Sequence, residues 1–533
     1  MKHTAQTRGV GKMGAEKNVD RAEAIRKSLD RFCRGGKIRV VETHISWIYL
    51  TGRFAFKVKK PVDFGFVNFS TLERRHFFAL EELRLNRRVA PEIYLGLVRF
   101  TQSGADLRLN GRGRTVEYGV KMVQFDRRKE LDRLLEKGKL RAPLLDRFAV
   151  ELAAFHDRAI RAPSGSLYGT PALIAAPMRD NFRQIRGLGL TRSGRRRLVR
   201  LEEWTESNLR QRKGDLSKRK ERGFIRECHG DLHLANMVLL NKEVKAFDCL
   251  EFDKKLRFID TMSDLAFLLM DLDAKRSFHL STRFLNRYLC ASGDYPGMAV
   301  LRTYQVYRAM VRAKVLSLTL GQPGHSARKK EALRIERENY YRLAEGYTAS
   351  PGPYLVILSG FSGSGKSYLA EKVAEISGAI WIRTDVERKR ITGTAGERRT
   401  ALYSVDMTRK TYRAVSDLAS NCLAEGYPVI LDGAFLKAEQ RLEAIERAEE
   451  LNIPWILLRT EAGERVMRSR ILRRMRKRDD PSDADLKVLD LQMRTDQPIT
   501  GLDPRRLIRV NTDSGLDPVR VKNRILGRIR RVY

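Results

Sequence analysis

The sequence predicts two domains of different fold class, an α+β domain with two lobes followed by an α/β domain with a parallel sheet. Strand-like segments gather between residues 40 and 125 and helical patterns follow them, which is typical of an α+β domain. After residue 354, apolar runs alternate with helical segments, which is typical of a parallel sheet wrapped by helices. We expect a basic tail and first helix in residues 1–35, the α+β domain in 36–345, a linker in 346–353 and the α/β domain in 354–533.

The chain is strongly basic. It has 104 lysines and arginines against 65 aspartates and glutamates, which gives a formal net charge of +39. One explanation is a polyanionic partner such as nucleic acid, and the other is an arginine-rich composition spread over the surface. The charge therefore makes nucleic acid a candidate partner without identifying it.

The cysteines and the terminal segment indicate the compartment. Five cysteines are widely scattered, odd in number and without a C-x-x-C pair, which argues against a disulfide framework or a structural zinc site. We find no apolar run long enough to span a bilayer and no apolar secretory region at the N-terminus. The sequence therefore predicts a cytoplasmic protein without a membrane span, and it leaves the oligomeric state open.

A helix at Arg21–Cys33 precedes the α+β domain. β-branched and aromatic residues then dominate Val40–Lys60, which we expect to form two or three strands. The further predicted elements are a helix at Leu72–Arg88, strands at Tyr94–Phe100, Asp106–Leu109 and Val116–Phe125, and helices at Leu144–Ile160, Asn181–Arg222 and Arg302–Tyr341.

His229-Gly230-Asp231 begins the most informative stretch of this domain. Asn236 follows Asp231 by five residues, and two short strands joined by a turn then lead to Asp248. In a kinase catalytic loop, one aspartate accepts the proton of the substrate hydroxyl, while an asparagine and a second aspartate hold Mg²⁺. The order and spacing of these residues follow the same chemical logic.

This stretch, CHGDLHLAN…AFDCLEFD, resembles the aminoglycoside phosphotransferase family, in which His-Gly-Asp replaces the His-Arg-Asp of protein kinases. The resemblance covers roughly Glu42 to Leu320 and implies a protein-kinase-like bilobal fold. It also implies that Asp231 is the catalytic base and that Asn236 and Asp248 are Mg²⁺ ligands.

Lys57 lies in a strand like the one that carries the phosphate-pairing lysine in kinase-type domains. The resemblance implies that Lys57 binds the α/β-phosphates of ATP and that Glu82 or Glu81 orients it. Lys59 lies two residues further along the same strand face and competes for this role. Asp264 matches a later aspartate of the family that is more often structural than catalytic.

The segment Tyr354–Ala370 carries the strongest motif of the chain. An apolar, β-branched run predicts a buried strand, the next residues fit G-x-x-x-x-G-K-[ST], and a helix follows. Backbone N–H groups of such a loop wrap a polyphosphate, the lysine reaches the β/γ-phosphates and the serine holds Mg²⁺. The sequence therefore predicts an ATP site formed by Gly360, Gly363, Ser364, Gly365, Lys366, Ser367 and Tyr368.

Two later strands of this domain lead to aspartates, Asp385 and Asp432. Ligands bind at the carboxyl ends of parallel strands, and Asp432 ends a Walker-B-like strand that could hold Mg²⁺ through water. This half resembles a family of small P-loop kinases whose members include sugar, antibiotic and polynucleotide 5′-kinases. The resemblance implies Asp385 as general base and Arg388 as a substrate contact.

Arg470 and Arg474 lie in the basic segment Arg465–Asp485. Because they are four residues apart, they face one side of a helix. This arrangement suits a lid that closes arginines over a transferring phosphoryl group, and a solvated charged face is the alternative.

The whole chain resembles bacterial bifunctional aminoglycoside phosphotransferase/ATP-binding proteins. These patterns predict an ATP- and Mg²⁺-dependent phosphotransferase with two nucleotide sites, which moves a γ-phosphoryl group to a hydroxyl of a small molecule. The resemblance suggests an aminoglycoside-like or sugar-like acceptor, yet aminoglycosides are polycations and a chain this basic repels them on average. The alternative is a nucleic-acid-associated ATPase or polynucleotide 5′-kinase, with the first domain as a pseudokinase or regulatory module.

Overall fold

The computed structural model describes residues 7–33, 37–65, 67–104, 106–188, 190–322, 324–349, 352–393, 404–477, 484–513 and 515–532. It divides into two compact units that each combine several stretches of the chain. Unit 1 comprises Met1–Leu144, Arg158–Gly169 and Lys220–Asp264, and unit 2 comprises Leu145–Asp157, Thr170–Arg219 and Leu265–Tyr533. Helical segments before residue 346 thus share unit 2 with the α/β part. This division does not test the domain limits predicted from the sequence.

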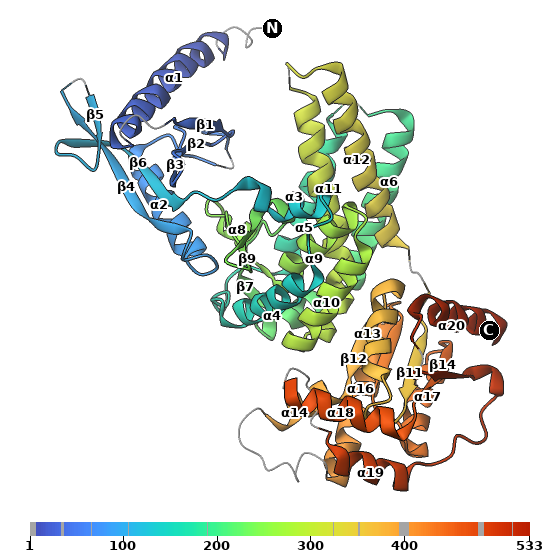
Figure 1. Cartoon of the computed structure of the whole chain (residues 1–533). Helices are drawn as coiled ribbons and strands as arrows, with labels where there is room; N and C mark the ends of the chain where they lie inside the picture. The colour runs from blue at the N-terminus through green and yellow to red at the C-terminus, as the bar shows by residue number, and fades with distance from the viewer. Residues whose placement is uncertain are drawn as a thin grey trace. The chain divides into compact units, whose positions relative to one another are not determined.

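A six-stranded antiparallel sheet forms the N-terminal part of unit 1, in the order β1-β2-β3-β6-β4-β5. Its strands are β1 (Arg39–Glu42), β2 (Ser46–Leu50), β3 (Phe54–Lys59), β4 (Tyr94–Ser103), β5 (Asp106–Leu109) and β6 (Arg114–Val123). The helices α1 (Thr7–Phe32) and α2 (Leu72–Asn86) lie beside this sheet (Figure 1). Ile25 of α1 shares one buried cluster with Phe56, and Leu83 of α2 shares another with Val120.

The remainder of unit 1 consists of short elements that carry loops. They are η1 (Arg127–Lys129), α3 (Leu131–Glu136), β7 (Ile225–Glu227), η2 (Leu234–Asn236), β8 (Met237–Leu240), β9 (Glu243–Ala246), α8 (Lys254–Arg257) and β10 (Phe258–Asp260). β7 pairs with β10, and β8 pairs with β9, both in antiparallel fashion. These two ribbons hold the ends of the loops that carry Asp231 and Asp248.

Helices form the first part of unit 2. They are α4 (Ala142–Arg158), α5 (Pro171–Arg186), α6 (Arg192–Gln211), α7 (Lys213–Glu221), α9 (Thr261–Ala274), α10 (Phe278–Ser292), η3 (Tyr295–Gly297), α11 (Met298–Leu320) and α12 (Ala327–Thr348), of which α4, α7 and α9 begin or end in unit 1. Phe182, Leu198, Phe267 and Tyr340 belong to one buried cluster that joins α5, α6, α9 and α12.

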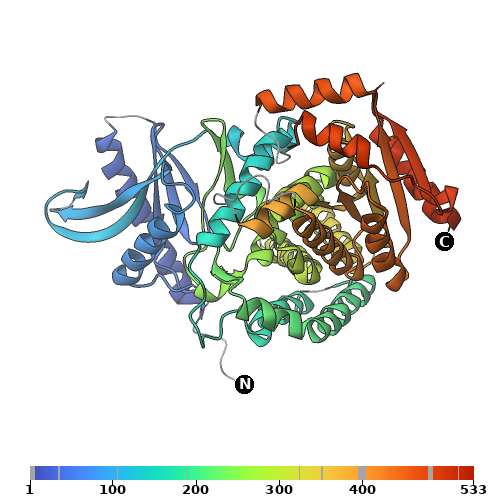
Figure 2. The same ribbon diagram turned by 90° about the horizontal axis from the view of Figure 1, so that it is seen from below.

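The second part of unit 2 is a five-stranded parallel sheet in the order β12-β13-β11-β14-β15. The elements are β11 (Leu355–Ser359), α13 (Lys366–Ser377), β12 (Ile380–Arg383), α14 (Thr384–Thr392), α16 (Val405–Ala424), β13 (Val429–Asp432), α17 (Ala438–Glu450), β14 (Trp455–Glu461), α18 (Glu464–Lys477), α19 (Leu486–Thr495), η4 (Pro504–Arg506), β15 (Leu507–Asn511) and α20 (Pro518–Val532). Figure 2 gives a second view of these strands and helices. The predicted α/β fold with a parallel sheet is confirmed for this part.

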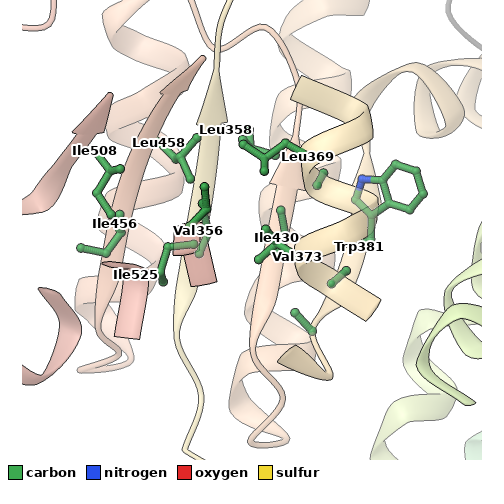
Figure 3. Close-up of a cluster of buried hydrophobic side chains, with 14 of the residues drawn as sticks. Val356, Leu358, Leu369, Val373, Trp381, Ile430, Ile456, Leu458, Ile508 and Ile525 are labelled. Carbon is green, nitrogen blue, oxygen red and sulfur yellow. The ribbon is translucent and has the colours of Figure 1, made fainter. Parts of the chain in front are cut away.

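One face of this sheet buries a hydrophobic core beneath α13 and α20. Figure 3 shows Trp381 of β12 at one end of the core and Ile508 of β15 at the other. Val356 of β11, the strand before the phosphate loop, lies between them and is 1% exposed. The strand that precedes the loop is therefore a rigid support for it.

Several elements differ from the sequence-based expectation. The first helix begins at Thr7, within the segment expected to be a tail, and α12 continues to Thr348, into the expected linker. β14 and β15 were not predicted. Residues 350–351 of the expected linker and residues 478–483 of the expected lid lie outside the described residues. Among the helices that the structure describes, none combines the length and the apolar character that crossing a bilayer requires.

Candidate active sites

The loop that carries Asp231 is anchored by Asp264. The two carboxylate oxygens of Asp264 accept hydrogen bonds from the backbone N–H groups of His229 at 3.0 Å and Gly230 at 2.9 Å, and Asp264 is 0% exposed. Gly230 has a φ of +86°, and a Cβ at this position would lie 3.0 Å from the carbonyl oxygen of Leu256. Asp264 therefore fixes the backbone of the loop, which is a structural role.

Asp231 and Asn236 lie within hydrogen-bonding distance. Asn236 Nδ2 donates to Asp231 Oδ2 at 3.0 Å, and His233 Nε2 lies 3.4 Å from the same oxygen. His229 accepts the backbone N–H of Asp231 on Nδ1 at 3.3 Å, and its Nε2 lies 3.0 Å from the carbonyl oxygen of Phe247. Burial lowers the pKa of His229, so this ring orients the loop as a neutral group.

A backbone hydrogen bond holds the residue before Asp248 against Asn236. The N–H of Phe247 donates to the carbonyl oxygen of Asn236 at 2.9 Å, and the N–H of Asp248 donates to the hydroxyl of Tyr94 at 3.0 Å. Asp248 has a φ of +64°, a left-handed conformation that costs a non-glycine residue about 1–2 kcal/mol. Such strain is concentrated at functional sites. The amide and carboxylate oxygens of Asn236 and Asp248 are of the kind that Mg²⁺ prefers, so the donor types fit this ion.

Both candidate lysines contact Glu82. Lys57 Nζ lies 2.8 Å from Glu82 Oε1 and 2.6 Å from Asp248 Oδ1, whereas Lys59 Nζ lies 2.8 Å from Glu82 Oε2 and pairs with Glu251. Glu81 instead pairs with Arg257 at 2.9 Å. Lys57 is thus the lysine that touches a predicted metal ligand, and Lys59 is 2% exposed within a buried ion-pair cluster.

The charges of this cluster stabilise one another. Burial by itself raises the pKa of Glu82, but the ammonium groups of Lys57 and Lys59 outweigh it and lower this pKa to about 2. Burial likewise opposes the charge on Lys57, and the carboxylates of Asp248 and Glu82 raise its pKa well above the usual value. Glu82 therefore holds both lysines in their charged form.

The phosphate loop of unit 2 requires its glycines. Gly360 has a φ of +154°, and a Cβ there would lie 2.3 Å from Thr460 Oγ1. Gly363 has a φ of +80°, and a Cβ there would lie 2.6 Å from the carbonyl oxygen of Met467. Ser364 Oγ lies 2.7 Å from Thr460 Oγ1 and ties the loop to β14. Gly365, with a φ of +82°, precedes the first turn of α13.

The end of this loop meets the end of β13. Ser367 Oγ donates to Asp432 Oδ1 at 3.2 Å, and Lys366 Nζ donates to the carbonyl oxygen of Phe361 at 3.1 Å. Burial raises the pKa of Asp432, and the guanidinium of Arg383, 3.7 Å away, opposes this change. A hydroxyl and a carboxylate oxygen held side by side fit Mg²⁺, which prefers such hard ligands.

A cavity of about 240 Å³ adjoins this pair. Its lining combines residues predicted to bind Mg²⁺ and phosphate with the predicted general base Asp385 and the predicted substrate contact Arg388. The lining residues are Ser362, Lys366, Ser367, Arg383, Thr384, Asp385, Arg388, Thr408, Tyr412, Asp432, Gly433, Ala434, Leu436, Lys437, Gln440, Ala484, Val488, Leu491, Gln492 and Thr495. Arg388 is 7% exposed and donates to Thr408 Oγ1 at 3.3 Å.

The two arginines of the expected lid both lie on α18 but bind different partners. Arg470 donates to the carbonyl oxygen of Gly363 at 3.2 Å and to Thr512 Oγ1 at 2.9 Å, so it contacts the phosphate loop. Arg474 donates to the carbonyl oxygen of Ala484, and neither arginine lines the cavity. Tyr368, at the first turn of α13, is 55% exposed. The catalytic roles of both arginines stay a prediction.

Sequence reasoning missed residues whose side chains are aromatic or lie in ion-pair networks. Tyr94 binds the backbone of Asp248, Glu251 pairs with Lys59, and Trp381 donates from Nε1 to Asp432 Oδ2 at 3.1 Å. A tyrosine or tryptophan in an apolar strand gives no signal beyond that of a core residue. Glu251 lies in the stretch AFDCLEFD, where its charge close to Asp248 is the one sequence signal that could have marked it as a site residue.

Residues 355–499, which include the phosphate loop, match the model of the AAA domain family AAA_33. Two relatives are the uncharacterized protein Rv2004c of Mycobacterium tuberculosis (strain ATCC 25618 / H37Rv) and the uncharacterized protein Mb2027c of Mycobacterium bovis (strain ATCC BAA-935 / AF2122/97). Each is 31% identical over 443 residues, which covers 82% of this chain and 86% of the relative. The chain belongs to the same family as these mycobacterial proteins.

Solved structures similar to this chain include three kinases. A gluconokinase from Sinorhizobium meliloti 1021 is 21% identical, covering 34% of this chain and 94% of its own, with a TM-score of 0.25. The Mycobacterium tuberculosis APS kinase CysC is 18% identical, covering 34% and 99%, with a TM-score of 0.27. The amicoumacin kinase hAmiN is 11% identical, covering 57% and 88%, with a TM-score of 0.33. Each TM-score is below 0.5, so these likenesses carry no conclusion about this chain.

Proposed function

We propose that the chain is an ATP- and Mg²⁺-dependent phosphotransferase with one nucleotide site in each unit. The observation that carries this proposal is the contact of 3.2 Å between Ser367 and Asp432, beside a cavity that Asp385 and Arg388 also line. Phosphate-binding, metal-binding and candidate proton-accepting groups thus meet at one place. A hydroxyl compound in this cavity would stand next to the γ-phosphate of ATP.

In the second site, catalysis would consist of positioning and electrostatic stabilisation. Lys366 and the backbone of the loop bind the phosphates, and Arg470 steadies the loop at Gly363. Ser367 and Asp432 would hold Mg²⁺, which would supply positive charge to neutralise the phosphates. Asp385 accepts the proton of the acceptor hydroxyl, and Arg388 orients the acceptor.

In the first site, Asp231 accepts the proton of a second hydroxyl compound. Lys57, held by Glu82, binds the α/β-phosphates, and Asn236 and Asp248 would hold Mg²⁺. We propose an aminoglycoside-like or sugar-like acceptor for this site on the family resemblance alone. A cytoplasmic location belongs to the same proposal, and it rests on the cysteine pattern.

The test measures ATP turnover and product mass with a library of hydroxyl metabolites. We expect Asp231→Ala to abolish one product and Lys366→Ala to abolish a different one. Asp106→Ala and Lys372→Ala are matched controls. Asp106 pairs with Arg31 at the surface, and Lys372, about 1.7 turns beyond Lys366 on α13, pairs with Glu375. If neither active-site substitution changed turnover, the proposal would be wrong.

A second candidate function follows from the charge of α20. Arg520, Arg524, Arg528 and Arg531 line one hollow of about 530 Å³ on this helix, which suits a phosphate backbone. The candidate is a nucleic-acid-associated ATPase or polynucleotide 5′-kinase, with unit 1 as a pseudokinase or regulatory module. RNA or DNA would then stimulate ATP turnover at low salt. Absence of nucleic-acid binding at low salt would remove this candidate.

A further inference from the structure

Helix α10 covers the outer edge of the parallel sheet of unit 2. β12 is an edge strand of this sheet, so one side of its backbone faces away from β13. The side chain of Asn286, which is 4% exposed, donates from Nδ2 to the carbonyl oxygen of Ala379 at 2.9 Å and accepts the N–H of Trp381 on Oδ1 at 2.8 Å. One amide side chain thus satisfies backbone groups that a further strand would otherwise bind.

Trp381, whose backbone N–H Asn286 binds, contacts the candidate metal site through its side chain. Trp381 is 3% exposed, and its Nε1–H donates to Asp432 Oδ2 at 3.1 Å. Ser367 donates to the other oxygen of the same carboxylate at 3.2 Å. Both oxygens of Asp432 therefore have a fixed donor, and hydrogen bonds of this kind orient carboxylates that bind metals.

Ion pairs hold α10 against the helix that follows the phosphate loop. Arg287 pairs with Glu371 of α13, and its guanidinium carbon lies 5.5 Å from the centre of the Trp381 ring. Arg283 pairs with Glu371 at 3.2 Å and also with Glu375. α10 therefore contacts α13, which carries Ser367, and β12, whose Trp381 binds Asp432 at the end of β13.

We propose that Trp381 and Asn286 are positioning residues of the P-loop metal site, so that a helix encoded before residue 345 completes that site. Trp381 orients Asp432 directly, and Asn286 acts through Trp381 by fixing its backbone. The inference rests on the proposed metal role of Asp432. It assigns to a helix that precedes the P-loop part of the sequence a function in the second nucleotide site.

The test is nucleotide binding to the full-length protein in a Lys57→Ala background, which removes the proposed phosphate-binding lysine of the first site. It is measured by calorimetry with a non-hydrolysable ATP analogue, with Mg²⁺ and again with EDTA. The ratio of the two dissociation constants reports the metal contribution and requires no turnover. Trp381→Phe keeps an aromatic ring and removes only the N–H donor. Trp455→Phe is the matched control, because the buried Trp455 of the same sheet donates from Nε1 to Glu449 at 3.0 Å.

We expect Trp381→Phe to weaken Mg²⁺-dependent binding by about tenfold and to leave binding in EDTA unchanged, since residues of this kind contribute about 10- to 100-fold to metal affinity. Asn286→Ala should act in the same direction, and Asn286→Asp, which keeps the acceptor oxygen, should have a smaller effect. Asn208→Ala, in α6, is the control for loss of a side-chain amide that contacts Thr303. Trp455→Phe and Asn208→Ala should bind as the wild type does.

Asp432→Asn separates the two ways in which the inference can fail. If Asp432→Asn abolishes the Mg²⁺ contribution while Trp381→Phe and Asn286→Ala bind like their controls, the positioning role is wrong and the proposed function stands. If Asp432→Asn has no effect, the proposed metal site fails, and the inference fails with it. Equal losses for Trp381→Phe with Mg²⁺ and with EDTA would indicate general damage and would also overturn the positioning role.

Discussion

At the scale of single residues, the buried carboxylate of Glu82 is the most sensitive point of the first site. It is 0% exposed and contacts the ammonium groups of both Lys57 and Lys59. Removing one partner of a buried ion pair leaves a charge without compensation, which costs about 3–5 kcal/mol. The stability of unit 1 and the orientation of Lys57 therefore depend on the same side chain.

We predict that Glu82→Ala lowers the free energy of unfolding by about 3–5 kcal/mol and weakens nucleotide binding at the first site. The measurement is urea unfolding of the full chain together with nucleotide binding to the Lys366→Ala background. Glu81→Ala is the control, since Glu81 is partly exposed and its partner Arg257 also pairs with Glu227. Equal effects of the two substitutions would contradict the prediction.

The sequence could name these residues but could not choose between them. Lys57 and Lys59 share one strand face, and Glu81 and Glu82 are neighbours on a helix, so spacing leaves both pairs open. The choice depends on which side of α2 faces the sheet, and tertiary packing decides that. Trp381 was beyond sequence reasoning for a different reason, because its indole N–H acts through a partner that is 51 residues away.

At the scale of elements, the turn between β11 and α13 fits tightly against α18. A Cβ on Gly363 would lie 2.6 Å from the carbonyl oxygen of Met467, whereas a Cβ on Gly378, at the end of α13, would meet nothing within 4 Å. Both glycines have a positive φ, of +80° and +74°. The two positions therefore share the backbone strain and differ in the clash.

We predict that Gly363→Ala abolishes nucleotide binding at the second site, because the loop and α18 must move apart. Gly378→Ala should cost only about 1–2 kcal/mol of stability and leave nucleotide binding intact, since it carries the strain alone. Calorimetric titration and thermal unfolding of both variants check this difference. Retention of binding by Gly363→Ala would show that the loop tolerates the displacement.

A contact between α9 and α12 predicts a dependence of stability on pH. Burial raises the pKa of Asp273 to about 7, although the hydroxyl of Tyr347, 2.6 Å from Asp273 Oδ2, lowers it in part. The folded-state pKa lies above the unfolded value of 3.8. The contribution of the protonated Asp273 to the free energy of unfolding is therefore fully present below pH 3.8 and is lost as the pH rises toward 7. The ionisation of Asp273 should therefore make the helical part of unit 2 less stable at neutral pH than at acidic pH.

We predict that Asp273→Asn raises the unfolding temperature at pH 8 and has little effect at pH 3, where the aspartate is largely protonated in both states. Thermal unfolding of the variant and the wild type across this pH range gives the comparison. An equal change at both pH values would mean that packing, and not ionisation, controls this position.

The order of strands and helices could be predicted from the sequence wherever a motif or a clear hydrophobic period marked an element. β11, β12 and β13 were predicted because each leads to a chemically informative residue. β14 and β15 were missed, although Trp455, Ile456, Leu457 and Leu458 form an apolar run, because no site residue drew attention to it. The division into units was not predictable, since it follows from contacts between distant stretches of the chain.

At the scale of the whole molecule, the net charge of +39 should dominate encounters with polyanions. We predict binding to RNA whose affinity falls steeply with salt, because bound phosphates release counterions. Replacing Arg520, Arg524, Arg528 and Arg531 by glutamine should lower the slope of log affinity against log salt by about one for each lost phosphate contact. Filter binding at several salt concentrations measures this slope.

The control replaces four exposed arginines of α6, namely Arg192, Arg195, Arg196 and Arg210. If both sets lower the slope equally, the charge acts as a diffuse surface property and α20 has no special role. If only the α20 set does so, the hollow on that helix is the site of contact.

The cover that α10 places over β12 also bears on how the protein can be shortened. A fragment beginning at residue 354 would keep the phosphate loop but lose Asn286, and it would leave the edge of β12 bare and remove the contact of Arg287 with Trp381. A bare, apolar strand edge is a template for pairing with another chain. Such a fragment should therefore self-associate, and light scattering should detect its aggregation at concentrations where the full chain stays dispersed.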